Sequence, residues 1–338
     1  MNNLLKTLTI CGVSLVPLTS FAESNTVYGD FRYSYNNIDN GTDSTISGNN
    51  NATRLGFKGD IGEKKGITAF YHLQFGANVD GDAAGKSFGQ RFFFAGIKGD
   101  FGKLAYGRTS TPYKMAGLKN DPFYDTSAGS GFGGSNYGLS PTTNGWSDNT
   151  IAYSSPKLGN FTLNASTYLD DTDANEHDTN IGVFYKQNSF SGGIQYMNVG
   201  DTGVVAKSIA DSTSIRVHGE YKSTSWSFAA SVETIDVSAG DSQQYAYINA
   251  TYKSSADIKW AASYGSVSDV SEAADGTGLT FGVFYQLLEK TTLYGLYSSK
   301  SSDDYTVPDD TTGNFKQLGL FDRDVLSIGI SHKFSFTI

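Results

Sequence analysis

The sequence predicts an all-β fold, a 16-stranded antiparallel transmembrane β-barrel. Apolar and polar residues alternate with a period of two along most of the chain, which is typical of strands with one apolar and one polar face. The connections between these strands alternate between short and long. The 338 residues include 21 Tyr and 22 Phe beside 39 Gly and 6 Pro. This composition suits a barrel that presents aromatic side chains to lipid.

Residues 1–22 are expected to be a cleaved signal peptide, followed by the barrel domain at 23–338. Lys6 precedes an apolar run, and Ser20-Phe21-Ala22 has the small-x-small form of a cleavage site. The single cysteine, Cys11, would leave with this peptide, so we expect no disulfide and no thiolate chemistry in the mature chain. Lipid attachment at Cys11 is the less favoured alternative, because the apolar run continues past it.

The charge and the hydropathy narrow the class of protein. Loss of Lys6 changes the formal net charge from −9 to −10, and this acidic balance argues against nucleic acid as a partner. No later segment reaches the roughly 18 consecutive apolar residues of a membrane-spanning helix. Strands, rather than helices, would therefore have to cross the membrane.

The strands are read from the alternation. It is clearest from Ile215 to Lys222, where Ile, Val, Gly and Tyr share one face and Arg, His, Glu and Lys the other. Because a soluble sandwich strand shows the same pattern, alternation alone does not select a membrane barrel. The expected strands lie near 26–36, 52–60, 66–78, 89–98, 102–109, 147–154, 161–170, 178–187, 190–199, 211–222, 225–237, 241–253, 257–268, 277–286, 291–300 and 322–336.

The lengths of the connections favour the membrane barrel. Short turns are expected at 98–102, 187–190 and 222–225, whereas long polar loops are expected at 37–51, 79–88, 110–146, 200–210 and 301–321. Short turns on one side and longer loops on the other are typical of outer-membrane barrels. Aromatic residues that flank the short turns fit an interfacial girdle, and they are Tyr153, Phe161, Tyr185, Phe190, Tyr221, Trp226, Tyr252 and Tyr285.

Several ordered motifs resemble the general Gram-negative porin family over nearly all of the mature chain. They are Val27-Tyr28-Gly29, Arg54-Leu55-Gly56-Phe57-Lys58-Gly59, Ala95–Gly102, Tyr106-Gly107-Arg108, Asp121-Pro122-Phe123, Asp148–Pro156 and Ser331-His332-Lys333-Phe334. The resemblance implies a 16-stranded homotrimer in the outer membrane, with a long third loop folded into the lumen. It also implies a water-filled channel for passive diffusion of ions and small hydrophilic solutes. Family members usually end on Phe, whereas this chain continues to Ile338, so we expect an extended last strand.

Charged residues are the candidates for the pore constriction, because charge at the narrowest point biases which ions enter. The alternation turns four cations of the first four strands inward, and two acids lie in the third loop. These candidates are Arg32, Arg54, Lys58, Arg91, Asp121 and Asp125. Trp146 stands where many family members carry an arginine, so it is expected to line the lumen and to lower the local positive charge. With the acidic net charge, this substitution predicts a weak preference for cations.

Arg108 shares the parity of outward-facing neighbours. An unpaired outward arginine would cost roughly 2–4 kcal/mol near the membrane midplane, so we expect it at a subunit interface, with the extracellular rim as the alternative. The other expected partners are lipopolysaccharide, outer-membrane lipid and small solutes. The acidic clusters at 170–178 and 303–310 are expected to be solvated loop charge rather than Ca²⁺ or Mg²⁺ sites. No cofactor and no metal are expected.

Two other functions stay open at this point. A substrate-selective channel, such as one for oligosaccharides, would use Trp146, Phe93 and Tyr124 as a stacking path. A barrel without a transport function, an adhesin or an enzyme, is the less favoured alternative, because no Ser/His/Asp arrangement is evident among the four histidines.

Overall fold

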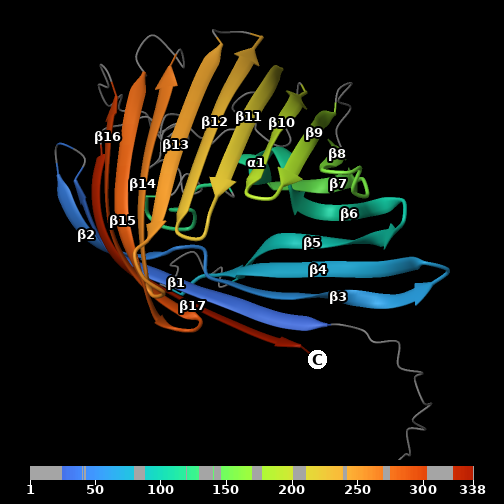
Figure 1. The fold of residues 1–338 in the computed structure, drawn as a ribbon, viewed down its shortest axis with the longest axis horizontal. Helices are drawn as coiled ribbons and strands as arrows, with labels where there is room; N and C mark the ends of the chain where they lie inside the picture. The colour runs from blue at the N-terminus through green and yellow to red at the C-terminus, as the bar shows by residue number, and fades with distance from the viewer. Residues whose placement is uncertain are drawn as a thin grey trace, which may run out of the picture.

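The computed structural model describes residues 25–39, 41, 43–79, 88–118, 120–128, 140, 146–169, 177–200, 211–238, 242–268, 275–302 and 323–337. These residues form one closed antiparallel barrel (Figure 1). Neighbouring strands pair in chain order, and β1 pairs with β17 from Thr26↔Thr337 to Asp39↔Asp324. Because every strand then has two neighbours, the backbone hydrogen bonds are satisfied within the wall.

The strands are β1 (Thr26–Asp39), β2 (Ser44–Asn50), β3 (Arg54–Lys64), β4 (Ile67–Ala77), β5 (Phe88–Gly99), β6 (Gly102–Ser110), β7 (Trp146–Ser154), β8 (Phe161–Tyr168), β9 (Asp178–Gln187), β10 (Phe190–Val199), β11 (Ser212–Lys222), β12 (Trp226–Val237), β13 (Gln243–Lys253), β14 (Ile258–Ser268), β15 (Gly276–Leu288), β16 (Thr291–Ser302) and β17 (Arg323–Thr337). Both β2 and β3 pair with β1, so together they make one of the 16 barrel strands. The predicted fold class is confirmed.

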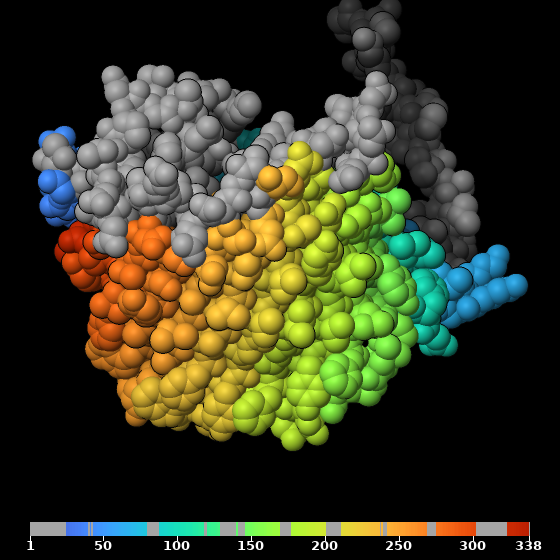
Figure 2. All heavy atoms as spheres, turned by 90° about the horizontal axis from the view of Figure 1, so that it is seen from above, coloured from blue at the N-terminus to red at the C-terminus, as the bar shows by residue number. Residues whose placement is uncertain are grey.

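The two faces of the wall have opposite chemistry. The outer face (part of which is seen in Figure 2) carries exposed apolar side chains, among them Phe31, Ile215, Val217, Phe281 and Ile328. The alternate positions turn inward and are polar and buried, as at Ser34, Gln195, Arg216, Thr280 and Ser298. Apolar outside and polar inside is the reverse of a soluble core and is the pattern of a transmembrane barrel.

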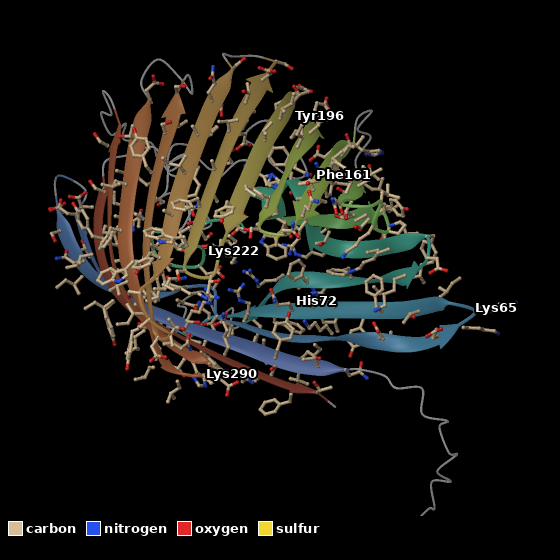
Figure 3. All side chains as sticks on the ribbon, in the orientation of Figure 1. Lys65, His72, Phe161, Tyr196, Lys222 and Lys290 are labelled. Atoms are coloured by element: carbon tan, nitrogen blue, oxygen red, sulfur yellow. The ribbon has the colours of Figure 1, made fainter. Side chains whose placement is uncertain are left out.

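The aromatic girdle forms at the short turns, as predicted. Ring centroids lie 4.9 Å apart for Phe190 and Tyr221 and 4.4 Å apart for Trp226 and Tyr252. Phe161, labelled in Figure 3, packs 5.1 Å from the ring of Tyr185 in the same way. These rings sit on the outer face, where an amphipathic side chain suits the boundary between lipid and water.

The first hairpin is longer than expected. Residues 37–39 and 44–50 were predicted as loop, but they pair with each other from Asn37↔Ile46 to Asp39↔Ser44. The expectation was wrong because this segment is polar and largely exposed on both faces, so no apolar alternation marks it as a strand. At the other end of the chain, the expected extension of the last strand is confirmed, since β17 continues through Phe336.

The segment between β6 and β7 contains one short helix, α1 (Pro112–Leu118). Among the residues that the structure describes, no helix has the length and apolar character needed to cross a membrane. Helix α1 lies within the ring of strands in Figure 1. It contacts β8, β9, β10 and β11, so this segment is positioned against the inner wall.

Candidate functional site: a loop and a charged wall in the lumen

The local sequence explains why the helix begins where it does. Thr111 precedes α1, and its hydroxyl oxygen accepts a hydrogen bond of 2.8 Å from the backbone N–H of Lys114. A threonine in this capping position satisfies one of the free N–H groups at the start of a helix. Pro112 occupies the first helical position, where a missing N–H carries no penalty.

Helix α1 is fastened to the wall by a buried ion pair. The Nη2 atom of Arg216 lies 2.6 Å from the Oε2 atom of Glu233, and Nη1 of Arg216 donates to the carbonyl oxygen of Tyr113 at 2.9 Å. The Tyr113 hydroxyl donates to Oε1 of Glu233 at 3.0 Å. Burial, reinforced by the adjacent Glu233 carboxylate, raises the pKa of Tyr113 well above its usual range, so this hydroxyl remains a donor at neutral pH.

The middle of the loop runs along β13. The Asn249 side-chain amide donates to the carbonyl oxygen of Asn120 at 2.6 Å. The Tyr247 hydroxyl donates to Oδ1 of Asp121 at 2.9 Å, and the same oxygen accepts from the backbone N–H of Phe123. Phe123 is fully buried in a small apolar cluster that is completed by Ala128, Ala261, Tyr294 and Leu296.

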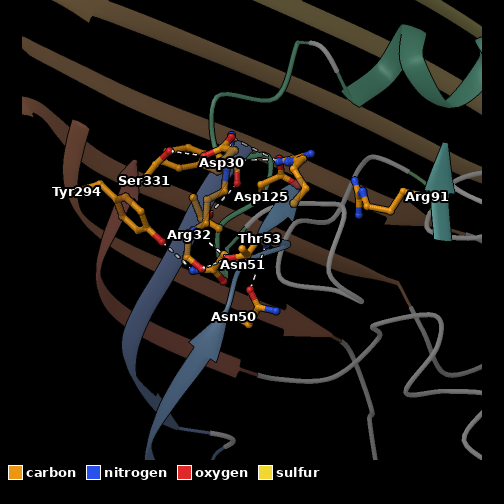
Figure 4. Close-up of polar contacts among 12 residues, drawn as sticks. Asp30, Arg32, Asn50, Asn51, Thr53, Arg91, Asp125, Tyr294 and Ser331 are labelled. Carbon is orange, nitrogen blue, oxygen red and sulfur yellow. Dashed lines mark hydrogen bonds and ion pairs between the residues drawn. The ribbon is translucent and has the colours of Figure 1, made fainter. Parts of the chain in front are cut away.

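The 125–128 part of the loop reaches β1, β3 and β17. The Ser127 hydroxyl lies 2.7 Å from Oδ1 of Asn36 and 3.1 Å from the hydroxyl of Ser327. The Asp125 carboxylate makes ion pairs with both Arg32, at 3.2 Å from Nη1, and Arg54; Asp125 and Arg32 are labelled in Figure 4. The described part of the loop therefore crosses the interior, from α1 at β11 and β12 to residues 125–127 at β1, β3 and β17.

A second acid completes this cluster. Oδ2 of Asp30 lies 2.6 Å from Nη2 of Arg32 and 3.8 Å from Nη2 of Arg54, and Oδ1 accepts from the hydroxyl of Ser331 at 2.9 Å. Two arginines thus share two carboxylates, one from the wall and one from the loop. The structure brings together three of the predicted site residues, Arg32, Arg54 and Asp125.

A bulge sets the direction in which Arg54 points. Tyr33 lies opposite Asn50 and Asp30 lies opposite Arg54, so the segment between β2 and β3 carries one residue more than the matching part of β1. Ala52 has a positive φ of 57°, which is where such a bulge takes up the extra residue. Asn51 is buried and donates to the Tyr294 hydroxyl at 2.9 Å, which holds the bulge against the wall.

A second bulge places Arg91 in the lumen. Gln74 pairs with Phe92 and the adjacent Phe75 pairs with Gln90, which leaves Arg91 as the extra residue. Its Nε donates to Oε1 of Gln74 at 2.9 Å. The same bulge overturns one expectation: Phe93, predicted to face the lumen with Arg91, packs instead on the outer face against Phe75, with ring centroids 4.8 Å apart.

Trp146 lies among three cations. Its ring is 4.8 Å from the guanidinium carbon of Arg91, 4.6 Å from Nζ of Lys114 and 6.0 Å from the guanidinium carbon of Arg108. Burial and the neighbouring Arg91 lower the pKa of Lys114 to about 7. Lys114, which lies in the loop, therefore supplies the positive charge that the sequence predicted to be missing at Trp146. The sequence did not predict this role because a loop has no apolar–polar alternation that shows which side chains face the lumen.

The remaining predicted residues lie elsewhere. Asp121 is bound to β13, apart from the arginines. The Nζ atom of Lys58 lies 5.4 Å from the ring of Tyr28. Arg108 is paired with Asp148, with Nη1 2.8 Å from Oδ2, so it has a charge partner that the sequence did not reveal.

Cavities flank the loop and are rich in lysine. The larger measures about 1040 Å³ and lies between α1 and the walls of β5 to β11; its charged lining residues are Lys103, Lys157, Lys186, Lys222 and Glu220. The smaller measures about 420 Å³, and its charged lining residues are Arg32, Lys253, Lys259, Lys333, Asp125 and Asp257. In both cavities the cations outnumber the acids.

The described residues offer no metal site. Within the described ranges, no group of three or more His, Cys, Asp or Glu side chains lies close enough to hold a metal ion. Residues 170–176 and 303–310 of the acidic clusters lie outside the described residues. Asp178, expected to be solvated loop charge, is instead buried at the start of β9, where Oδ1 accepts a hydrogen bond of 2.8 Å from the backbone N–H of Gly200.

A closed barrel with an apolar exterior, a polar interior and a charged loop across that interior defines a membrane channel of the porin class. The model of the Gram-negative porin family matches residues 8–305. The chain belongs to this family, whose barrels form channels in the outer membrane.

Solved structures share the fold. An anion-selective porin from Comamonas acidovorans aligns with a TM-score of 0.77 at 18% identity and covers 92% of this chain and 100% of the other. OmpT of Vibrio cholerae aligns at 0.68 with 18% identity, covering 94% and 99%. OmpF of Salmonella typhi aligns at 0.69 with 16% identity, covering 92% and 97%.

One curated relative also matches. A chitoporin from Vibrio furnissii is 31% identical over 147 residues, which are 41% of this chain and 38% of that protein. The match therefore spans well under half of either protein.

Proposed function

We propose that the chain is a general diffusion porin whose narrowest point is bordered by the 120–128 segment together with the arginines of β1 and β3 that this segment contacts. The observation that carries the proposal is the contact of Asp125 with Arg32 and Arg54 inside the barrel. Charged groups of both signs at a constriction keep it wet and bias ion flow. Purified protein in a planar bilayer should give stepwise ohmic conductance, and proteoliposomes should swell in small sugars. A protein that inserts without conductance would contradict the proposal.

The lumen charges favour anions. At the level of the loop, the cations Arg32, Arg54, Arg91 and Lys114 face the acids Asp30, Asp121 and Asp125, and the cavities add a lysine excess. This balance argues against the weak cation preference expected from the sequence, which assumed a missing charge at Trp146. The similarity in fold to a porin named as anion-selective agrees with this proposal. A reversal potential of the anion-selective sign in a KCl gradient tests it.

A second candidate function is an oligosaccharide channel. The specific observation is a row of rings on the inner wall, with centroid distances of 4.8 Å from Trp146 to Phe92 and 5.8 Å from Phe92 to Phe94. The partial similarity to a chitoporin points in the same direction. Block of the open-channel current by chitooligosaccharides at micromolar concentration would favour this candidate over general diffusion.

We further propose that the chain has no catalytic role. Two of its histidines have partners that do not suit a triad, because His72 hydrogen-bonds the Tyr28 hydroxyl and His332 hydrogen-bonds the Thr291 hydroxyl. Esterase and protease assays on the purified, conducting protein should give no turnover.

The assembly and the processing are also proposals. We infer a homotrimer with Arg108 near the subunit contact, removal of residues 1–22 on export, and lipopolysaccharide around the outer rim. One of the similar structures, OmpT of Vibrio cholerae, is described as a trimer form. N-terminal sequencing of the protein from outer membranes tests the cleavage, with Glu23 as the expected first residue.

A further inference from the structure

One side of the lumen combines aromatic rings and cations in a continuous strip. We define the aromatic–cation strip by Trp146, Phe92, Phe94, Phe70, Arg91 and Lys103. The ring centroids follow one another at 4.8, 5.8 and 6.4 Å from Trp146 to Phe70. Phe92, Phe94 and Lys103 line the larger cavity, so the strip leads from the proposed constriction into open space.

The membrane does not explain these rings. The run Phe92-Phe93-Phe94 places rings on both faces of β5, and only Phe93 serves the outer face. Phe92 and Phe94 are half-buried: the His72 ring stacks on Phe92 at a centroid distance of 4.8 Å, and the rest of both rings lines the larger cavity. Apolar surface left in contact with water costs about 25 cal/mol per Å². A planar ligand that covers these rings would recover that free energy.

A cation accompanies each end of the strip. Nζ of Lys103 lies 4.3 Å from the ring of Phe70 and 5.7 Å from that of Phe94. The guanidinium carbon of Arg91 lies 4.8 Å from the ring of Trp146. The Lys103 side chain is exposed, and within the described chain its neighbour Lys98, rather than Lys103 itself, forms the ion pair with Asp60. Asp60 therefore acts on Lys103 only at longer range, and the exposed ammonium of Lys103 can pair with a carboxylate from solution.

We propose that the aromatic–cation strip binds planar aromatic carboxylates and guides them through the pore. The ring of such an ion stacks on Phe92 or Phe94, while its carboxylate pairs with Lys103 or Arg91. A neutral sugar would use the rings but leave the cations without a partner. An inorganic anion would use the cations but leave the rings in water. The inference rests on the proposed diffusion function, because it names a solute class for the same pore.

The experiment compares benzoate with cyclohexanecarboxylate, which has the same charge and similar bulk but no aromatic face. Open-channel conductance of the purified outer-membrane protein is recorded first in KCl. If the protein shows no conductance in KCl, the proposed function is contradicted, and this result is known before any ligand is added. Each anion is then titrated, and the half-blocking concentration is read from the current.

Benzoate should block at a concentration about fivefold lower than cyclohexanecarboxylate, since a favourable ring contact is worth on the order of a fivefold change in affinity. The double variant Phe92→Leu/Phe94→Leu should remove this difference. Phe93→Leu, one position away on the outer face, should retain it. Lys103→Gln should weaken the block by both anions.

Three results would overturn the inference. One is equal half-blocking concentrations for benzoate and cyclohexanecarboxylate in a conducting wild-type pore. Another is a difference that persists in the conducting Phe92→Leu/Phe94→Leu variant. Block by diacetylchitobiose in place of benzoate would also overturn it, in favour of a neutral sugar path. A variant whose single-channel conductance steps equal those of the wild type has folded and inserted.

Discussion

At the scale of single residues, the electrostatic potential in the pore depends on which of its arginines are paired with carboxylates. Asp125 and Asp30 are shared between Arg32 and Arg54, whereas Arg91 hydrogen-bonds the neutral Gln74 and Tyr124 side chains and packs on the Trp146 ring, with Asp125 acting on it at longer range. Arg91 therefore keeps more of its positive potential for ions in transit. Buried or partly buried charges are screened less by salt than surface charges.

Reversing these charges should change selectivity. Arg54→Glu combined with Arg91→Glu should shift the reversal potential in a KCl gradient toward cation selectivity, because each substitution replaces a positive charge at the constriction with a negative one. Lys65→Glu/Lys290→Glu is the matched control, because both lysines are exposed at short turns and line neither cavity; both are labelled in Figure 3. The control should have a smaller effect that fades at high salt. An equal shift in both variants would show that the constriction lies elsewhere.

Lys114 predicts a pH-dependent selectivity. Its pKa is lowered by burial to about 7, so the side chain is charged below pH 7 and neutral above it. The groups that face it are Arg91, Arg108 and Asp125. Anion preference should therefore rise as the pH falls from about 8 to 6. Lys114→Met should abolish this change, and a pH response that survives in Lys114→Met would assign it to another group.

At the scale of elements, the decisive contact is between α1 and the β11–β12 hairpin. Arg216 and Glu233 are directly opposite each other in the register, and both hold Tyr113. This arrangement turns a cross-strand pair into a clamp on the loop. The width of the pore at this point then depends on two strands that are distant in sequence from the loop itself.

Breaking this clamp should destabilise the loop. Arg216→Gln leaves the Glu233 carboxylate buried without its ion-pair partner, and such a loss typically costs about 3–5 kcal/mol. We expect larger open-channel current noise and a lower denaturation midpoint in detergent. Lys222→Gln is the control, because Lys222 lies on the same strand, is exposed and is 3.9 Å from Glu220. Quiet channels in Arg216→Gln would mean that other contacts hold the loop.

At the scale of the whole molecule, the asymmetry of the connections predicts the orientation in the membrane. Turns such as 223–225 should face the periplasm and the long loops the exterior. Because the mature chain is expected to contain no cysteine, single introduced cysteines give a clean readout. Ser301→Cys should react with an impermeant maleimide on intact cells, and Thr224→Cys should react only after lysis. The opposite pattern would reverse the topology.

The subunit contact proposed for Arg108 is testable in the same protein. Arg108→Ala should lower the temperature at which a trimer band is lost on semi-native gels, while the monomer keeps its strands by circular dichroism. Asp148→Ala separates two explanations, because it removes the ion pair and leaves the arginine. An unchanged trimer in both variants would remove Arg108 from the interface.

The sequence predicted the strands and their faces because alternation reports directly on the two environments of a barrel wall. The Arg216–Glu233 pair was missed, because the predicted turn at 222–225 would place Arg216 opposite Ser231, whereas Lys222 in fact pairs with Ser227. Phe93 and Lys114 were also missed, for other physical reasons. A bulge moves the following side chains to the opposite face, which breaks the alternation on which the prediction for Phe93 depended. A loop has no alternation that could predict where Lys114 points. Contacts such as that between Asp125 and Arg54 form only because the loop folds back through the lumen, and the local sequence pattern does not predict the course of that loop.

The two bulges have a consequence for how this pore can change during evolution. Side chains alternate strictly along a strand, so one residue more or less moves every following side chain to the opposite face until the register is restored. Deletion of Ala52, with no substitution anywhere, would exchange the lumen and lipid environments of Arg54 and its neighbours. Insertion or deletion of one residue at 51–53 or at Arg91 can therefore alter permeation as strongly as replacement of a charged residue. Such a change also turns an arginine of the lumen toward the hydrocarbon of the membrane, so selection would remove it quickly.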